Sequence, residues 1–270
     1  MCGIVGAIAD RDVMPILMEG LRRLEYRGYD SAGVAIQSAL GELQRFRALG
    51  KVAVLQAAVD NTDVTGNLGI AHTRWATHGV PAERNAHPQM SDVSGVSVAV
   101  VHNGIVENHN ALRDQLLEWG YSFTSETDTE VIAHLLAHKL KVGKDLFSAV
   151  LEVSQDLTGA YALAAASPDD DQRIVVTQAG SPLVIGLGEG ENFIGSDAAA
   201  LLPVTRRFIF LEEGDIAEVR RDGVTIYDAA GMLVEREVKQ STMSDASVDK
   251  GPYRHYMLKE IFEQPGVIAE

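Results

Sequence analysis

The start of the chain constrains the fold most, because a lone cysteine there is followed at once by an apolar run. Cys2 is the only cysteine in 270 residues, and only Met1 precedes it. The next residues, Gly3 to Ile8, are small or apolar, which is typical of a buried β-strand. A strand that starts here holds this end of the chain in place instead of leaving it to fray.

Two interpretations of Cys2 are open at this point. A lone cysteine beside a strand is most often a small buried hydrophobic residue. Removal of Met1 would instead leave a thiol and a free α-amine on one residue, which are the two parts of a self-contained nucleophile. An α-amine has an ordinary pKa of roughly 7.7–8.0, which suits a general base near neutral pH. Motifs further along the chain decide between the two.

Composition narrows the class of protein. Hydrophobic residues make up 46% of the chain, which is enough for a sizeable core. The formal net charge of −15 argues against binding to nucleic acid or to anionic membranes. One cysteine excludes an internal disulfide and fits a reducing compartment. We find neither the basic flank of a signal peptide nor an apolar run near the roughly 20 residues that span a bilayer, so we expect a cytoplasmic protein.

The pattern of apolar residues predicts an α+β fold. Helical spacing predicts helices over residues 13–26, 108–119, 127–140 and 146–157. Short apolar runs predict strands at residues 32–36, 43–47, 68–73, 96–102, 160–166, 174–178, 183–187, 193–196, 208–211, 216–220 and 224–227. Turn residues such as Asp222-Gly223 separate the later strands, and such tight connections imply antiparallel pairing. We therefore expect stacked antiparallel sheets covered by helices.

Polar clusters follow or flank several of the apolar runs, where functional sites tend to lie. The clusters are RGYDSAG from Arg27, HTRWATHG from His72, NAHP from Asn85, HNG from His102 and ETDTE from Glu126. Together with CGIVG at Cys2, they resemble the class II glutamine amidotransferases, which use an N-terminal cysteine. The resemblance runs from residue 2 to about 238. It implies the N-terminal-nucleophile hydrolase fold, a four-layer αββα sandwich with two mainly antiparallel sheets.

The end of the chain predicts a domain boundary. Residues 240–250 are polar and are expected to form a linker after a glutaminase domain at residues 2–239. The segment YRHYMLKEIFEQP, within residues 251–270, resembles the entry to a sugar-phosphate isomerase domain and is expected to begin an amphipathic helix. The match is therefore closest to the amidotransferases that aminate fructose 6-phosphate. One mild departure is the stretch Gln89–Ser97, which is expected to be a longer loop than is typical.

The resemblance also implies the catalytic residues. Cys2 is similar to the nucleophile that attacks the side-chain amide carbon of glutamine. Asn103 and the backbone N–H of Gly104 resemble the oxyanion hole, and a side-chain amide beside a glycine N–H suits a tetrahedral oxyanion. Taken without the resemblance, Asn-Gly is equally a turn signal after a strand.

The substrate-binding residues are likewise implied by the resemblance. Arg74 is similar to the residue that holds the α-carboxylate of glutamine, and Asp128 to the one that holds the α-ammonium. By default, Arg74 would be a solvated surface residue and Asp128 only a helix cap. The pocket residues with less specific roles are Thr77, His78 and His87. The supporting residues are Arg27, which organises the surroundings of the nucleophile, and Trp75, which gates the path of ammonia.

Other signals are weaker. His134 and His138 have a spacing that could bind zinc, but HExxH is absent and no further ligand cluster is evident, so we expect neither a metal nor a cofactor. Gly186, Gly188 and Gly190 fit a hairpin turn better than a dinucleotide site.

We expect the partners to be L-glutamine and, only through an isomerase domain beyond this chain, fructose 6-phosphate, with a homo-oligomeric full-length protein. The alternatives are an amidotransferase with a phosphoribosyl or asparagine-forming acceptor reaction and a non-catalytic glutamine sensor. A sensor would need neither Cys2 nor Asn103, so their presence favours an enzyme.

Overall fold

The computed structural model describes residues 2–28, 30–38, 40–93, 95–170 and 172–242, together with 252, 253, 258, 259, 261, 262 and 264. Met1 and most of the expected linker and C-terminal helix lie outside the described residues. None of the described helices is long and apolar enough to cross a membrane.

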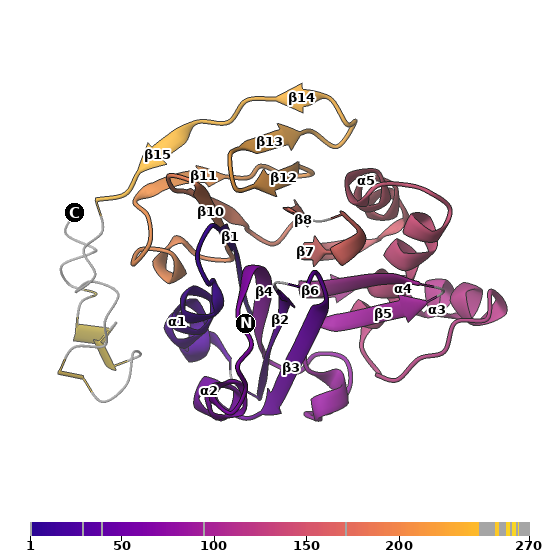
Figure 1. Cartoon of the computed structure of the whole chain (residues 1–270), viewed down its shortest axis with the longest axis horizontal. Coiled ribbons are helices and arrows are strands. Elements are labelled where there is room, and N and C mark those ends of the chain that lie inside the picture. Colours follow the sequence, from indigo (N-terminus) through magenta and orange to yellow (C-terminus); the bar gives the residue numbers. More distant parts are fainter. Residues whose placement is uncertain are drawn as a thin grey trace.

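Two β-sheets stack face to face, with helices on both outer sides (Figure 1). In spatial order, the first sheet contains β15 (Val238–Gln240), β11 (Arg207–Phe210), β9 (Val184–Leu187), β10 (Glu191–Gly195), β1 (Gly3–Ala9), β4 (Gly66–Arg74), β2 (Ser31–Ser38) and β3 (Leu43–Leu49). The second contains β14 (Leu233–Val234), β13 (Val224–Tyr227), β12 (Ile216–Arg220), β8 (Arg173–Ala179), β7 (Gly159–Ala166), β6 (Val96–Val106) and β5 (Gln89–Val93).

The helices complete the four layers. The first sheet packs against α1 (Met14–Leu24) and α2 (Val52–Asp60), and the second against α3 (His109–Glu118), α4 (Asp128–Lys141) and α5 (Leu146–Asp156). One apolar core lies between the sheets and one lies beneath each helical layer. The expected α+β sandwich of two antiparallel sheets is confirmed.

The first strand, β1, lies in the middle of its sheet and is buried on both faces. It pairs antiparallel with β10 on one side and β4 on the other. Ile4 and Ile8 belong to the core between the sheets, whereas Val5 and Ala7 belong to the core under α1. A side chain at Gly20 of α1 would meet Val5 at 2.8 Å, so this helix lies close against β1. Burial on both faces explains why the run after Cys2 is apolar throughout.

Several elements differ from the sequence-based expectation. The stretch Gln89–Ser97 is not a loop, because β5 pairs antiparallel with β6 from Gln89↔Val100 to Val93↔Val96. Its buried side chains are polar: Gln89 donates to backbone carbonyls, and Ser91 bonds the His134 ring. The expectation missed α2, β14 and β15. Gly188 and Gly190 lie in the turn of the β9–β10 hairpin, as expected, whereas Gly186 lies within β9 opposite Phe193.

Candidate active site

Cys2 lies at one end of the sandwich, directly before β1. The register Gly3↔Thr73 sets Cys2 beside the end of β4, where the Trp75 backbone N–H donates to Cys2 Sγ at 3.2 Å. Sγ also lies 3.5 Å from the Trp75 carbonyl oxygen. Burial raises the pKa of the Cys2 thiol, and the Trp75 N–H works against this rise. A thiol with a raised pKa is protonated near neutral pH, so it needs a base to become a nucleophile.

Asn103 and Gly104 reach the same end of the sandwich from the second sheet. Asn103 Nδ2 donates to the Cys2 carbonyl oxygen at 3.3 Å. Gly104 has a φ of +117°, and a Cβ there would lie 2.0 Å from the Ala160 carbonyl oxygen, so only glycine fits. The turn interpretation of Asn103-Gly104 is wrong, because β6 continues through both residues to Val106.

One edge of β6 has no strand neighbour among the described residues where it approaches Cys2. The pairing with β5 ends at Val100, so the rest of β6 is paired only on its β7 side. The Val106 N–H donates to Asp128 Oδ2 at 2.9 Å. Asp128 is the first residue of α4, but the cap of this helix is Thr127, whose side chain accepts from the Glu130 N–H. Asp128 is therefore not the helix cap; its carboxylate is turned toward the end of β6.

Arg74 ends β4 and is buried, with only 3% of its surface exposed. Its Nη2 donates to the carbonyl oxygens of His78 and, at 3.0 Å, of Gly79. Its Nη1 is buried without a hydrogen bond and lies 3.8 Å from Asp30 Oδ1. The default interpretation of Arg74 as a solvated surface residue is wrong. A buried donor without an acceptor is costly, which makes Nη1 a candidate ligand-binding group.

Two cavities meet at Cys2. The first, here called the outer cavity, has a volume of about 270 Å³ and is lined by Cys2, Arg27, Trp75, Thr77, Asn103, Gly104, Ile105, Ser181, Pro182 and Ser196. The second, here called the clamp cavity, holds only about 10 Å³ and is lined by Cys2, Arg74, Trp75, Thr77, His87, His102, Gly104 and Asp128. The outer cavity exposes mostly apolar surface, whereas the clamp cavity is lined by charged and imidazole groups.

Nine of the ten residues expected in the site line these two cavities. The exception is His78, which lines neither: its ring packs on His109 with centroids 4.7 Å apart, and only its carbonyl oxygen reaches Arg74. Arg27 lines the outer cavity and forms an ion pair with Asp197. Trp75 lies between the cavities and is 57% exposed.

Three buried histidines lie behind the site, and sequence reasoning gave two of them, His72 and His102, no role. The rings of His72 and His87 have centroids 4.4 Å apart, and those of His87 and His102 are 6.3 Å apart. Thr129 Oγ1 bridges His87 Nε2 and His102 Nδ1, at 3.0 Å from each. Burial lowers the pKa of His72 to about 3 and also lowers the pKa values of His87 and His102. All three are neutral at physiological pH.

Asp30 is a further residue that the sequence left without a role, although it stands in the RGYDSAG motif. Its carboxylate accepts hydrogen bonds from the Ala76 N–H and from Ser31 Oγ, the latter at 2.7 Å. It therefore ties the segment after β4 to β2, beside the Arg74 guanidinium.

The histidines with zinc-like spacing serve the fold. His134 Nδ1 bonds Ser91 and Nε2 bonds the Ser122 carbonyl oxygen, at 2.8 and 3.1 Å. His138 stacks on Trp119 at 4.3 Å between centroids. Among the described residues, no group of three His, Cys, Asp or Glu side chains is arranged to hold a metal ion.

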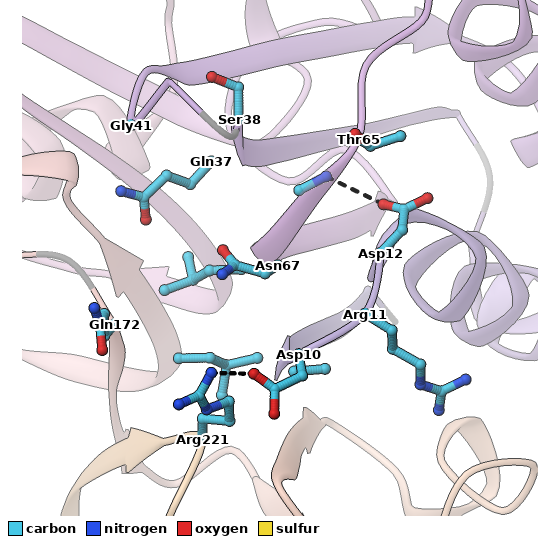
Figure 2. Close-up of a pocket in the computed structure, with 14 residues that line it drawn as sticks. Asp10, Arg11, Asp12, Gln37, Ser38, Gly41, Thr65, Asn67, Gln172 and Arg221 are labelled. Carbon is cyan, nitrogen blue, oxygen red and sulfur yellow. Dashed lines mark hydrogen bonds and ion pairs between the residues drawn. The ribbon is translucent and has the colours of Figure 1, made fainter.

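A third cavity, of about 410 Å³, lies beyond the other end of β1 (Figure 2). Figure 2 shows Asp10 paired with Arg221, and Asp12 accepting a backbone hydrogen bond, which comes from Gly66 at 3.1 Å. Arg11 pairs with Glu191 at 2.7 Å. Asp10, Arg11 and Arg221 are in ion pairs, Asp12 accepts from backbone N–H groups, and Cys2 lies at the opposite end of β1, so this cavity is not the candidate active site.

Comparison with known proteins identifies similar chains. A family model described as a glutamine amidotransferase domain matches residues 72–203. Glutamine–fructose-6-phosphate aminotransferase (isomerizing) of Shewanella oneidensis is 60% identical over 98% of this chain, and that of Pseudomonas aeruginosa is 59% identical over 99%. This chain spans 43% of the length of each relative. The solved structure of B. subtilis glutamine phosphoribosylpyrophosphate amidotransferase matches with a TM-score of 0.73 and 26% identity, over 84% of this chain and 49% of that one.

Proposed function

Because the chain belongs to the glutamine amidotransferases, we propose that it hydrolyses L-glutamine to L-glutamate and ammonia with Cys2 as the nucleophile. It is the glutaminase half of a glutamine–fructose-6-phosphate aminotransferase. One observation carries the proposal: the thiol, a side-chain amide donor and two opposite charges from four separate elements surround two cavities that meet at Cys2.

The chemistry follows from Cys2 and its neighbours. With Met1 removed, the α-amine takes the thiol proton, and Sγ adds to the side-chain carbonyl carbon of glutamine. The oxyanion formed in this step is stabilised by Asn103 Nδ2 and the Gly104 N–H. The C–N bond then breaks, and the nitrogen takes the proton and leaves as ammonia. Water adds to the remaining glutamyl thioester, and the thiol leaves with a proton as glutamate is released.

The charges of the clamp cavity suit the amino-acid end of glutamine. Arg74 Nη1, which has no hydrogen bond in the fold, would donate to the α-carboxylate. Asp128 would accept from the α-ammonium while its second oxygen stays on the Val106 N–H. Thr77 and His87 complete the wall of this cavity.

Glutamine binding requires the clamp cavity to open. Its volume of about 10 Å³ leaves room for about one water molecule, which is far smaller than an amino acid. The segment after Arg74 is held by the guanidinium through the carbonyl oxygens of His78 and Gly79. A carboxylate on Nη1 leaves these bonds to Nη2 in place, but Trp75 and Thr77 of this segment line the clamp cavity. We therefore expect residues 75–80 to shift when glutamine enters.

The full-length assignment rests on the relatives. Both are aminotransferases for fructose 6-phosphate, and this chain corresponds to less than half of each. Residues 2–239 form the glutaminase domain, 240–250 the linker and 251–270 the start of the isomerase domain, through which ammonia would reach fructose 6-phosphate. We further propose a cytoplasmic protein that is a homo-oligomer at full length. A phosphoribosyl acceptor is less favoured, since the solved phosphoribosyl enzyme is only 26% identical.

The test is release of glutamate by the purified chain, with and without alkylation of its thiol. Glutamate that disappears on alkylation is the expected result, and no glutamate would favour a sensor. Intact mass should show that the active fraction begins at Cys2; full activity in a fraction that retains Met1 would refute the role of the α-amine. With fructose 6-phosphate also supplied, we expect glutamate without amino sugar, and amino sugar in proportion to glutamate would overturn the domain assignment.

A further inference from the structure

The side-chain amide of Asn103 is held at both of its ends. Nδ2 donates to the Cys2 carbonyl oxygen at 3.3 Å, and Oδ1 lies 2.9 Å from His72 Nε2. If the amide were turned over, Oδ1 would face the Cys2 carbonyl oxygen, and two acceptors would repel each other. The Cys2 carbonyl therefore selects the orientation in which Nδ2 points toward the nucleophile.

This orientation decides which nitrogen of His72 carries the proton. Oδ1 can only accept, so the facing Nε2 must be the protonated nitrogen and Nδ1 the bare one. Nδ1 is buried and has no hydrogen-bond partner among the described residues. A proton on Nδ1 would be a buried unsatisfied donor, and it would also leave a lone pair on Nε2 against Oδ1.

We infer that His72 is a positioning residue for the proposed glutaminase reaction, whose Nε2–H holds Asn103 with its amide donor facing the oxyanion. This inference rests on the function proposed above. His72 does not line either cavity at Cys2 and acts only through Asn103.

The fold gives His72 the rigidity that this role needs. Its backbone lies in β4 between β1 and β2, at the register positions Ile4↔His72 and Gly33↔His72. Its ring is fully buried and packs on His87. Because burial also keeps the pKa of His72 near 3, the ring stays uncharged over the working pH range. The donor that it presents to Asn103 is therefore constant.

Matched variants test the inference by activity. His72→Gln keeps an N–H donor near the position of Nε2, whereas His72→Leu removes it at similar size. We expect His72→Leu to lower kcat about 10- to 100-fold, below the 10²–10³-fold effect of a lost oxyanion donor, with KM within about threefold. His72→Gln should recover most of kcat, and His138→Leu, remote from the site, should not change it. Equal losses in the Gln and Leu variants would overturn the inference.

A double variant separates positioning from general damage to the fold. In an Asn103→Ala background there is no amide to orient, so adding His72→Leu should change kcat by less than about twofold. A further loss equal to that of His72→Leu alone would show that His72 acts elsewhere.

A spectroscopic readout keeps the test independent of the proposed function. In ¹H–¹⁵N spectra of ¹⁵N-labelled protein, with the His72 signals identified by their loss in His72→Gln, the ring should be the Nε2–H tautomer. The Nδ1–H tautomer would overturn the inference even if the wild type releases glutamate. Conversely, a wild type that releases no glutamate would refute the proposed function while the tautomer still reports on Asn103.

Discussion

Both ends of β1 carry polar and charged side chains, but these side chains differ in how they are bonded. At the Cys2 end, five buried polar atoms lack a hydrogen bond, and they are the only such atoms among the residues that the structure describes: His72 Nδ1, Thr73 Oγ1, Arg74 Nη1, His87 Nδ1 and His102 Nε2. At the Asp10 end, Asp10 pairs with Arg221 (Figure 2). Arg11 pairs with Glu191, and the side chains of Asp10, Arg11 and Arg221 are exposed. The contrast teaches that buried polar groups left without partners mark a site better than polarity or cavity size, because such groups destabilise a fold that does not use them.

The largest expected effect is at the nucleophile. Cys2→Ala should reduce glutamate release to background, since no other thiol exists in the chain. Glutamine affinity should stay largely intact, because the thiol forms the bond while Arg74 and Asp128 provide the clamp. Glutamate release and calorimetric titration with glutamine measure the two effects. If the Cys2→Ala variant still released glutamate, the Cys2 end of β1 would not be the active site.

The next effect is at the oxyanion donor. Asn103→Ala should lower kcat by roughly 10²–10³-fold, because the amide acts more on the transition state than on bound glutamine. Asn103→Asp, which keeps the size but loses the donor, is the matched control and should be similarly impaired. Steady-state kinetics separate kcat from KM. An unchanged kcat with a raised KM would make Asn103 a binding residue.

A smaller loss is expected at the clamp. Arg74→Ala removes a charge-assisted bond worth about 1.5–3 kcal/mol, so glutamine should bind about 10- to 150-fold more weakly. An analogue without the α-carboxylate should lose much less. Calorimetric titration of both ligands measures the difference. Equal losses for the two ligands would mean that Arg74 acts through the fold, for instance by holding His78 and Gly79.

The buried histidines predict acid sensitivity of the folded state. Their pKa values are lowered by burial, to about 3 for His72, from the ordinary 6.5 that applies when the chain is unfolded. The unfolded chain therefore binds more protons below pH 6.5, and the stability of the fold falls as the pH falls; for His72 this loss continues down to about pH 3, by up to about 1.4 kcal/mol per pH unit. Urea unfolding between pH 7.5 and 5.0 measures the slope. Signals of these histidines that titrate near pH 6.5 in the folded protein would contradict the prediction.

The smallest effect is expected at the Asp10 end. Arg221→Ala breaks an exposed ion pair, which should cost at most about 1 kcal/mol of stability. Activity with glutamine should stay within about twofold of wild type, so this variant is also the matched control for Arg74→Ala. A large loss of activity would show that the two ends of β1 are coupled.

Much of the fold could be predicted from the sequence, because local patterns decide it. The apolar run after Cys2 predicts β1, and the helical spacing up to Leu24 predicts α1. Prediction failed for β5, where buried polar residues such as Gln89 and Ser91 hide the pattern of a half-buried strand.

The site was predictable only in part, for a different reason. The family resemblance that the motifs carry pointed to Cys2, Arg74 and Asn103, but the contact between His72 and Asn103 joins two sheets that are stacked face to face. No local pattern encodes which residues of stacked sheets meet. His72 and Asp30 therefore received no role until the strands were placed.

A proline in the sequence explains why the pairing of β5 with β6 ends at Val100. The register would continue from Gln89↔Val100 to residue 88 opposite Val101, but residue 88 is Pro88, which has no N–H to donate. The ladder stops there, and the backbone of β6 beyond it remains available to Asp128. The missing N–H of Pro88 thus separates the part of β6 that pairs with β5 from the part that approaches Cys2. Proteins that share this architecture can be searched for the same feature, a proline opposite the strand that carries the proposed oxyanion donors.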